Sequence, residues 1–301
     1  MTEPLHLSCA TDRHYLGHAA TMVRSALANA GAEVVVHVLH GPELPHAELV
    51  RLQAMCADER SEIVLHEIDP VCIAGLPVTG RFGGAMWYRT LLPELLPDVS
   101  RILYLDVDTL VLNRLEPLFE LDLGSNYLAA VANVFMEFHR YRLAQLGFEP
   151  GEYFNSGVLL LNLSEMREGE FAERVREAVQ TSAGPLEWPD QDALNLVSRD
   201  RWHAVHPRWN SMNSLRTRPS LADELFGARS LAEAVRDPTI RHFEGPEWGK
   251  PWHVLHERDG RRLYRRYREA TPWPSYPLEG GGVRNHLRRL MRDARGRSRV
   301  R

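Results

Sequence analysis

The sequence predicts an α/β protein in which a mainly parallel sheet is flanked by helices. Two observations lead to this fold class. Short apolar segments rich in β-branched residues alternate with segments whose apolar residues recur at helical spacing, which is typical of a parallel sheet covered by helices. The 301 residues, 44% hydrophobic and 25% charged, are also enough to bury a large core, as one large domain or two small ones.

Each element of the first half is predicted from its own local pattern. Apolar or β-branched runs predict strands. Apolar residues at helical spacing predict helices, and Gly31 marks the end of the first one. In chain order the elements are a strand at 5–10, a helix at 18–30, a strand at 34–39, a helix at 45–60, a strand at 62–68, a glycine-bearing loop at 80–84 and a helix at 86–96.

The second half repeats the alternation and then changes in composition. Pro189 lies near the start of its last predicted helix, where proline is favoured. Prolines and glycines between 272 and 282 mark a linker. We therefore predict a globular domain over 1–270 and a linker with a basic tail over 271–301. The elements of this half are strands at 102–112, 127–132 and 158–162, followed by helices at 165–182 and 190–198.

The tail has a charge pattern of its own. Residues 283–301 hold eight arginines and one aspartate, a formal charge of +7, whereas the rest of the chain carries −11. Val283, Leu287, Leu290 and Ala294 recur at helical spacing among the arginines and predict a short basic amphipathic helix. Such a helix favours peripheral contact with an anionic membrane. A solvated basic end is the alternative.

Composition restricts the function classes. A net charge of −4 argues against a general nucleic-acid-binding protein, so no nucleic-acid partner is expected. The first residues lack a signal-peptide pattern, and no run of 18 apolar residues predicts a membrane span. The three cysteines lack metal-ligand spacing, which favours reduced thiols. We expect a cytoplasmic protein, with contact at the inner membrane face if the tail binds lipid.

The most informative stretch is 102–112, an apolar run that carries two carboxylates, Asp106 and Asp108. On a regular strand, side chains at this spacing share one face. Burying two like charges is costly unless a cation or another positive partner compensates them. We therefore predict a divalent metal at the end of this strand, in a site where the metal holds a phosphorylated substrate.

Lys250 is the only lysine among 36 basic residues. A general replacement of lysine by arginine explains why lysine is rare in this chain. A compact ammonium differs from a guanidinium where a phosphate is bound in a tight site. The one lysine that remains therefore favours a functional role.

Five motifs in order make the sequence resemble glycosyltransferase family 8, the family of glycogenin and of the bacterial lipopolysaccharide galactosyl- and glucosyltransferases. They are CATDRHYLGHAATMVRSAL at 9–27, YRTLLPELLPDVSRILYLDVDTLVL at 88–112, YFNSGVLLLNL at 153–163, PDQDALN at 189–195 and HFEGPEWGKPW at 242–252. An Asp-x-Asp pair alone is weak, whereas the five motifs together are specific and extend from Leu5 to Trp252. The resemblance implies the GT-A fold, a Rossmann-like sheet that binds a nucleotide sugar at the carboxyl ends of its strands. It also implies retention of configuration at the anomeric carbon.

The resemblance further implies a metal and donor site. Asp106, Asp108 and His242 would ligate Mn²⁺ or Mg²⁺, and this donor set suits such an ion. Gly245 and Lys250 would contact the diphosphate of a UDP-sugar, although four residues separate them here where two are usual. Asp106 would also face the ribose, and the other implied donor-binding residues are Ala10, Thr11, Asp12, Tyr15, Arg89, Val107 and Asn133. For Thr11 and Asp12 the alternative role is helix capping. For Arg89 the alternative is a position on the surface.

Asn133, Asn155, Asp190 and Gln191 would line the reaction site, and the last three are the implied catalytic residues. A glutamine cannot act as a base, so Gln191 would position the sugar or stabilise positive charge through its carbonyl oxygen. Asp190 would bind sugar hydroxyls or serve as a nucleophile after a rearrangement. An acid at a helix N-terminus is the alternative for Asp190. We favour same-face substitution, in which the leaving phosphate deprotonates the acceptor.

The expected function is therefore metal-dependent transfer of glucose or galactose from a UDP-sugar. The sequence does not identify the acceptor, which is a glycan, a lipid-linked glycan or another molecule. One alternative is a non-catalytic nucleotide-sugar-binding protein on the same fold. Another is a phosphatase of the haloacid dehalogenase type, but that motif normally lies near the chain start and continues with Gly-Thr. A cation-dependent nucleotidyltransferase is a more remote option.

Overall fold

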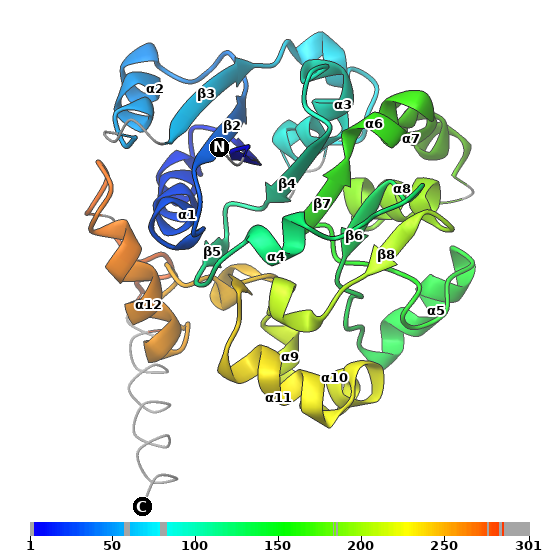
Figure 1. Ribbon diagram of the computed structural model, residues 1–301. Helices are drawn as coiled ribbons and strands as arrows, with labels where there is room; N and C mark the ends of the chain where they lie inside the picture. The colour runs from blue at the N-terminus through cyan, green and yellow to red at the C-terminus, as the bar shows by residue number, and fades with distance from the viewer. Residues whose placement is uncertain are drawn as a thin grey trace, which may run out of the picture.

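The computed structural model describes residues 3–56, 61–78, 83–182, 184, 186–275, 277–282 and 285. Within them a seven-stranded sheet runs in the order β3-β2-β1-β4-β7-β6-β8, with helices around it (Figure 1). Its strands are β1 (Leu5–Thr11), β2 (Val34–His40), β3 (Glu62–Glu67), β4 (Arg101–Leu105), β6 (Leu128–Ala130), β7 (Val158–Asn162) and β8 (Trp202–Ala204). A separate two-stranded ribbon pairs β5 (Thr109–Val111) with β9 (Ile240–His242).

The sheet is mainly parallel, as predicted. β3, β2, β1 and β4 are parallel neighbours, whereas β7 runs antiparallel to both β4 and β6. β8 is parallel to β6. The parallel arrangement brings the carboxyl ends of β1 and β4 to the same edge of the sheet, and β7 begins at that edge because its direction is reversed.

Twelve helices are found among the described residues. They are α1 (Leu16–Asn29), α2 (His46–Gln53), α3 (Leu92–Leu95), α4 (Glu116–Phe119), α5 (Glu137–Gln145), α6 (Leu163–Glu168), α7 (Phe171–Thr181), α8 (Pro189–Ser198), α9 (Ser214–Thr217), α10 (Pro219–Phe226), α11 (Ala228–Arg236) and α12 (Arg258–Arg268). Short 3₁₀ segments occur at Pro70–Ile73, Gly84–Leu91, Pro207–Asn210 and Glu247–Gly249. None of the described helices has the length and apolar character needed to cross a bilayer.

Side chains of alternate strand residues pack into two hydrophobic cores, one on each face of the sheet. Leu7 and Leu103 point to the face that packs against α1, whereas Ile102 and Tyr104 point to the face covered by α6, α7 and α8. A smaller cluster, in which Leu110 and Phe243 pack on Trp252 and α12, supports the β5–β9 ribbon. The ribbon is therefore held between the main sheet and α12, which lies beside α1 (Figure 1).

The predicted strand over 102–112 is interrupted. β4 ends at Leu105, residues 106–108 form a turn, and β5 leaves the main sheet to pair with β9. The expectation that Asp106 and Asp108 share one face of a regular strand was therefore wrong, because a turn separates the two strands at that point. The expected position of the acids, at the end of the strand, was correct.

Two predicted helices also differ. The helix predicted over 165–182 is split into α6 and α7 at Gly169 and Glu170. A Cβ at Gly169 would lie 2.1 Å from the Tyr127 hydroxyl, and Glu170 has φ of 48°, a left-handed conformation that cannot continue a right-handed helix. The helix predicted over 86–96 is mostly 3₁₀, and only 92–95 is α-helical, starting beside a proline at 93 that lacks a donor N–H.

The end of the described chain folds back onto the domain. The Trp273 indole donates to Glu48 (2.7 Å), and the Pro272 carbonyl accepts from Arg51 (2.6 Å). Glu279 exchanges backbone hydrogen bonds with the segment around Trp252. The tail residues Val283, Leu287, Leu290 and Ala294, like 57–60 of the second predicted helix and 80–82 of the glycine-bearing loop, lie outside the described residues.

Candidate functional site

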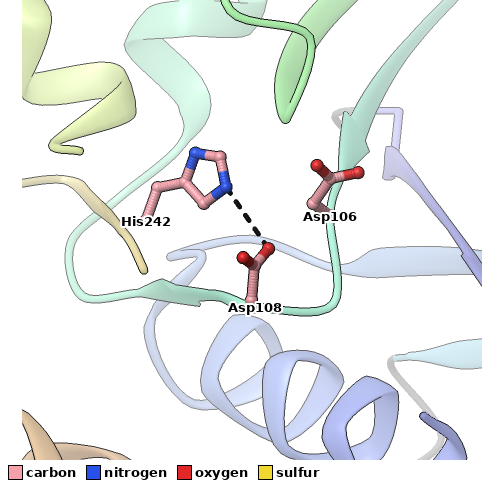
Figure 2. A group of neighbouring side chains, drawn as sticks. All are labelled: Asp106, Asp108 and His242. Carbon is pink, nitrogen blue, oxygen red and sulfur yellow. Dashed lines mark ion pairs between the residues drawn. The ribbon is translucent and has the colours of Figure 1, made fainter. Parts of the chain in front are cut away.

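Asp106 and Asp108 lie in the turn that follows β4. The Asp106 N–H donates to the Gly157 carbonyl (2.8 Å), and the Asp106 carbonyl accepts from the N–H (3.1 Å) and the hydroxyl (2.7 Å) of Thr109. These bonds end β4 and start β5. Both carboxylates are turned toward His242 at the carboxyl edge of the sheet (Figure 2).

The β5–β9 ribbon brings His242 to the same place. Thr109 is paired with His242, and the Phe243 N–H donates to the Asp108 carbonyl (2.9 Å). As a result, one ligand atom from each of Asp106, Asp108 and His242 lies within 4.8 Å of the others. Nε2 of His242 is 3.3 Å from Oδ1 of Asp108 (Figure 2). The predicted set of three therefore converges, although 134 positions separate Asp108 from His242.

Lys250 lies at this centre as well. Its ammonium forms an ion pair with the Asp108 carboxylate. Burial alone would raise the pKa of Asp108, but Lys250 and then His242 reverse this effect and lower it. Burial alone would lower the pKa of His242, but the Asp108 carboxylate raises it overall. The longer loop 246–249 therefore does not remove the only lysine from the site.

Arg89 is buried at the site, not on the surface. It lies in the 3₁₀ segment Gly84–Leu91 with 5% exposure, and its guanidinium stands 2.9 Å from Asp106 and 3.4 Å from Asp190. It also donates to the Ser156 carbonyl (2.5 Å). Burial raises the pKa of Asp190, and Arg89 opposes this shift. Arg89 thus links the acid after β4 with the acid at the start of α8.

A network of amides joins the remaining predicted reaction-site residues. The Asn155 amide donates to Oδ1 of Asn133 and to Oε1 of Gln191, each at 3.3 Å. Oε1 of Gln191 also accepts from the Ser156 N–H (2.9 Å), so this carbonyl oxygen is already satisfied within the protein. The structure therefore brings Asn133, Asn155 and Gln191 together, with the Gln191 carbonyl turned toward the start of β7.

The residues predicted to bind the nucleotide lie at the carboxyl end of β1. Oδ1 of Asp12 accepts from the N–H of Tyr15 (2.9 Å), the residue before α1, but no side chain caps the helix itself, so the capping alternative is wrong for both Thr11 and Asp12. Tyr15 lies close enough to Lys250 for the ammonium to oppose the rise that burial causes in the pKa of Tyr15. Thr11 is buried and Ala10 lies beside it at the strand end. These residues surround the same edge as the acids.

Gly245 and Val107 are the other two residues predicted to contact the donor. Gly245 has φ of 100°, a conformation that favours glycine, and lies three residues after His242, the last residue of β9. Val107 lies between the two acids and is partly buried against the core. Val107 therefore adjoins both acids, whereas Gly245 belongs to the loop that leaves β9.

Sequence reasoning missed two residues of the site. Asn210 is fully buried, its amide nitrogen donates to Oδ1 of Asn155, and its carbonyl oxygen faces Nδ1 of His242. Gly157 lies against His242 and Asp106, where a side chain would not fit. Gly157 stood within the quoted motif YFNSGVLLLNL, which was the available signal, whereas no quoted motif included Asn210.

Known proteins are similar to this chain over most of its length. The family model described as "Glycosyl transferase family 8" matches residues 6–256. "General stress protein A" of Bacillus subtilis is 29% identical over 278 residues, covering 90% of this chain and 95% of that protein. "Lipopolysaccharide 1,2-glucosyltransferase" of Escherichia coli is 24% identical over 282 residues, covering 92% and 81%.

Comparison with solved structures also finds glycosyltransferases. The galactosyltransferase LgtC, solved in complex with donor and acceptor sugar analogs, superposes with a TM-score of 0.78 and 26% identity, covering 91% of this chain and 98% of that one. The match to the family model extends over most of the chain and includes Asp106, Asp108 and His242. This chain belongs to glycosyltransferase family 8 and has the GT-A fold of its solved relatives.

Proposed function

We propose that this glycosyltransferase transfers glucose or galactose from a UDP-sugar to a glycan or lipid-linked acceptor, with a divalent cation and with retention at the anomeric carbon. The convergence of Asp106, Asp108 and His242 at the carboxyl edge of the sheet is the observation that carries the proposal. Ligands bind at this edge in open α/β sheets. Family membership supports the nucleotide-sugar donor.

The residues at this centre suit a divalent cation. Two carboxylates and one imidazole form a donor set that Mn²⁺ accepts, and Mg²⁺ is the alternative. Gly157 lets the chain pack closely against them, since a Cβ there would lie 2.3 Å from Cε1 of His242 and 2.8 Å from Oδ2 of Asp106 and would displace both side chains. A cation held by these residues would stabilise negative charge on the departing nucleoside diphosphate.

Lys250 and Gly245 are the proposed diphosphate contacts. Lys250 is paired with Asp108, so its ammonium already lies at the cation centre. On donor binding it would exchange this carboxylate for a phosphate oxygen, which gains negative charge as the bond to the sugar breaks. The free backbone approach at Gly245 suits a neighbouring phosphate. Tyr15, Thr11 and Ala10 would border the uridine.

Arg89, Asp190 and the amide network are the proposed donor-sugar contacts. Asp190 is held beside Arg89, and the Gln191 carbonyl accepts from Ser156. These contacts support a positioning role for both residues over a role of Asp190 as nucleophile. They favour same-face substitution, in which the bond from the anomeric carbon to the phosphate breaks and the bond to the acceptor oxygen forms on the same face. The acceptor proton then passes to the leaving phosphate oxygen.

Screening nucleotide sugars tests this function. We expect Mn²⁺-dependent hydrolysis of UDP-glucose or UDP-galactose in the absence of acceptor, together with a higher midpoint of thermal unfolding. Asp108→Asn should abolish both effects. Activity that survives exhaustive chelation would exclude the metal role, and donor binding without any turnover would indicate a non-catalytic binding protein. Capture of a sugar covalently attached to Asp190 would replace same-face substitution by a two-step route.

The basic tail gives a further proposal about location. Residues 283–301 carry +7, and all of them except Asn285 lie outside the described part of the chain. On sequence grounds we propose weak, salt-sensitive contact with the anionic inner face of a membrane, where a lipid-linked acceptor would be available. The catalytic domain over 1–270 would then act on the cytoplasmic side.

A further inference from the structure

We propose that Asn210 is a positioning residue that keeps a proton on Nδ1 of His242 and thereby presents Nε2 to the cation site. The inference rests on the proposed function, because it treats His242 as a metal ligand. It assigns a role to a residue that belongs to none of the motifs singled out in the sequence.

Asn210 ends the 3₁₀ segment Pro207–Asn210 and is completely buried. Its side chain contacts two residues of the site. Oδ1 lies 2.9 Å from Nδ1 of His242, and Nδ2 lies 2.8 Å from Oδ1 of Asn155. Asn210 is therefore the direct link between the cation centre and the amide network beside the proposed sugar position.

The direction of this link follows from a backbone group. The Gly157 N–H can only donate, and it points at one side-chain atom of Asn155 at 3.1 Å, which must therefore be the oxygen. Because an oxygen cannot donate, the Asn210 atom that faces it must be the amide nitrogen. The other Asn210 atom is then the oxygen, and it can only accept. Nδ1 of His242 must consequently carry a proton.

A second backbone group gives the same direction. The Ser156 N–H donates to Oε1 of Gln191 (2.9 Å), which identifies that atom as oxygen. This oxygen also faces the other end of the Asn155 amide at 3.3 Å, so that end must be the nitrogen. The orientation of Asn155 is thus fixed from both ends, and the tautomer of His242 does not depend on an arbitrary choice between amide oxygen and nitrogen.

The proton on Nδ1 determines the state of Nε2, on the other side of the His242 ring. With a proton held at Nδ1, the neutral ring has its lone pair at Nε2, 3.3 Å from an oxygen of Asp108. A lone pair aimed at a carboxylate is unfavourable unless a proton or a metal cation lies between them, and a proton on Nδ1 leaves Nε2 as the position for either. An aspartate at 210 would also hold Nδ1–H, but it could not donate to Asn155 and would add a third acid to the centre. Asparagine serves both partners without adding charge.

The first test uses the metal-free wild-type protein labelled with ¹⁵N-histidine. We expect a slowly exchanging Nδ1–H proton on His242, assigned by its loss in His242→Gln. A ring that carries its proton at Nε2 alone would overturn the proposal. This measurement needs neither metal nor donor, so it remains decisive if the protein fails to hydrolyse UDP-sugars and the proposed function falls.

The second test measures Mn²⁺ affinity in the presence of UDP by electron paramagnetic resonance. Asn210→Ala should weaken Mn²⁺ binding by roughly 10- to 100-fold, the range for groups that orient a metal-ligating histidine. Asn210→Asp should recover most of the affinity but not the turnover, because its carboxylate accepts from Nδ1–H but cannot donate to Asn155. A merely structural residue would not separate these two quantities.

Asn29→Ala is the control for lost stability. The Asn29 amide donates to Ser25, Val111 and Tyr267 and contacts none of the site residues above. The variant should keep wild-type Mn²⁺ affinity even if its unfolding midpoint drops. Wild-type affinity in Asn210→Ala, or an equal loss in Asn29→Ala, would contradict the positioning role.

Discussion

Replacing Gly157 by alanine should block the cation centre with a single methyl group. Gly157 is the residue before β7 and lies directly against the ring of His242. A Cβ built on it would lie 2.3 Å from Cε1 and 2.9 Å from Nε2 of His242, and 2.8 Å from Oδ2 of Asp106. The backbone at 157 is outside the left-handed region, so alanine suits the local conformation and the steric conflict is the main effect.

The size of the effect follows from these distances. Carbon atoms in ordinary contact are about 3.5 Å apart. The imidazole therefore has to move by about 1 Å, and its 2.9 Å bond to Asn210 opposes that movement. A misplacement of about 1 Å in a catalytic constellation can cost about 10²-fold in rate. We expect at least this loss in kcat/KM, with an overpacking cost of about 1–3 kcal/mol in the free energy of unfolding.

The assay compares Mn²⁺-dependent UDP binding by calorimetry with hydrolysis of the preferred UDP-sugar. Gly157→Ala should lose both while its circular dichroism remains that of a folded protein. Gly184→Ala is the matched control, because a Cβ there would meet nothing within 4 Å among the described residues. Wild-type UDP affinity in Gly157→Ala would refute the assignment of the cation to the space beside His242.

Three other changes have defined outcomes. Lys250→Ala should lower turnover by roughly 10²-fold, as expected for loss of one preorganised transition-state contact, and an unchanged rate would place the lysine outside the reaction. Burial and the neighbouring rings of His66 and His6 lower the pKa of His37 from 6.5 to about 3. Between these values the unfolded chain binds a proton that the folded chain does not, so the free energy of unfolding should fall as pH drops from 6.5, by up to about 1.4 kcal/mol per pH unit. Urea unfolding of His37→Gln should show a shallower fall, and an identical pH profile would assign the loss to other groups. Deleting 280–301 should abolish sedimentation with anionic liposomes at low salt but leave UDP-sugar hydrolysis intact, whereas a full-length protein that ignores such liposomes would disprove the membrane role.

Local sequence patterns predicted most elements because strand and helix periodicity reflects burial on each element. The β-branched run at 34–39 became β2, and the proline at 189 marked the start of α8. The helix predicted over 165–182 was wrong at Gly169 and Glu170, where the left-handed backbone of Glu170 separates α6 from α7. Tyr127 lies against Gly169 and leaves no room for a Cβ there, a contact that no window around 169 contains.

The sequence by itself determined the residue types of the site. Asp106 and Asp108 after an apolar run predicted a centre that needs positive charge, and the motifs added His242 and Lys250. Such residues can be predicted because burying like charges without compensation is costly, so paired acids in an apolar run require a partner wherever the chain folds.

Only the tertiary structure decided how these residues meet. The β5–β9 ribbon sets His242 beside Asp108, and Arg89 is buried between two acids instead of lying at the surface. Neither result follows from a local pattern, because strand pairing and hydrogen-bond direction join groups that are far apart in the chain. The physical reason is that periodicity reports which side of an element is buried, whereas the partner it meets there is set by long-range packing.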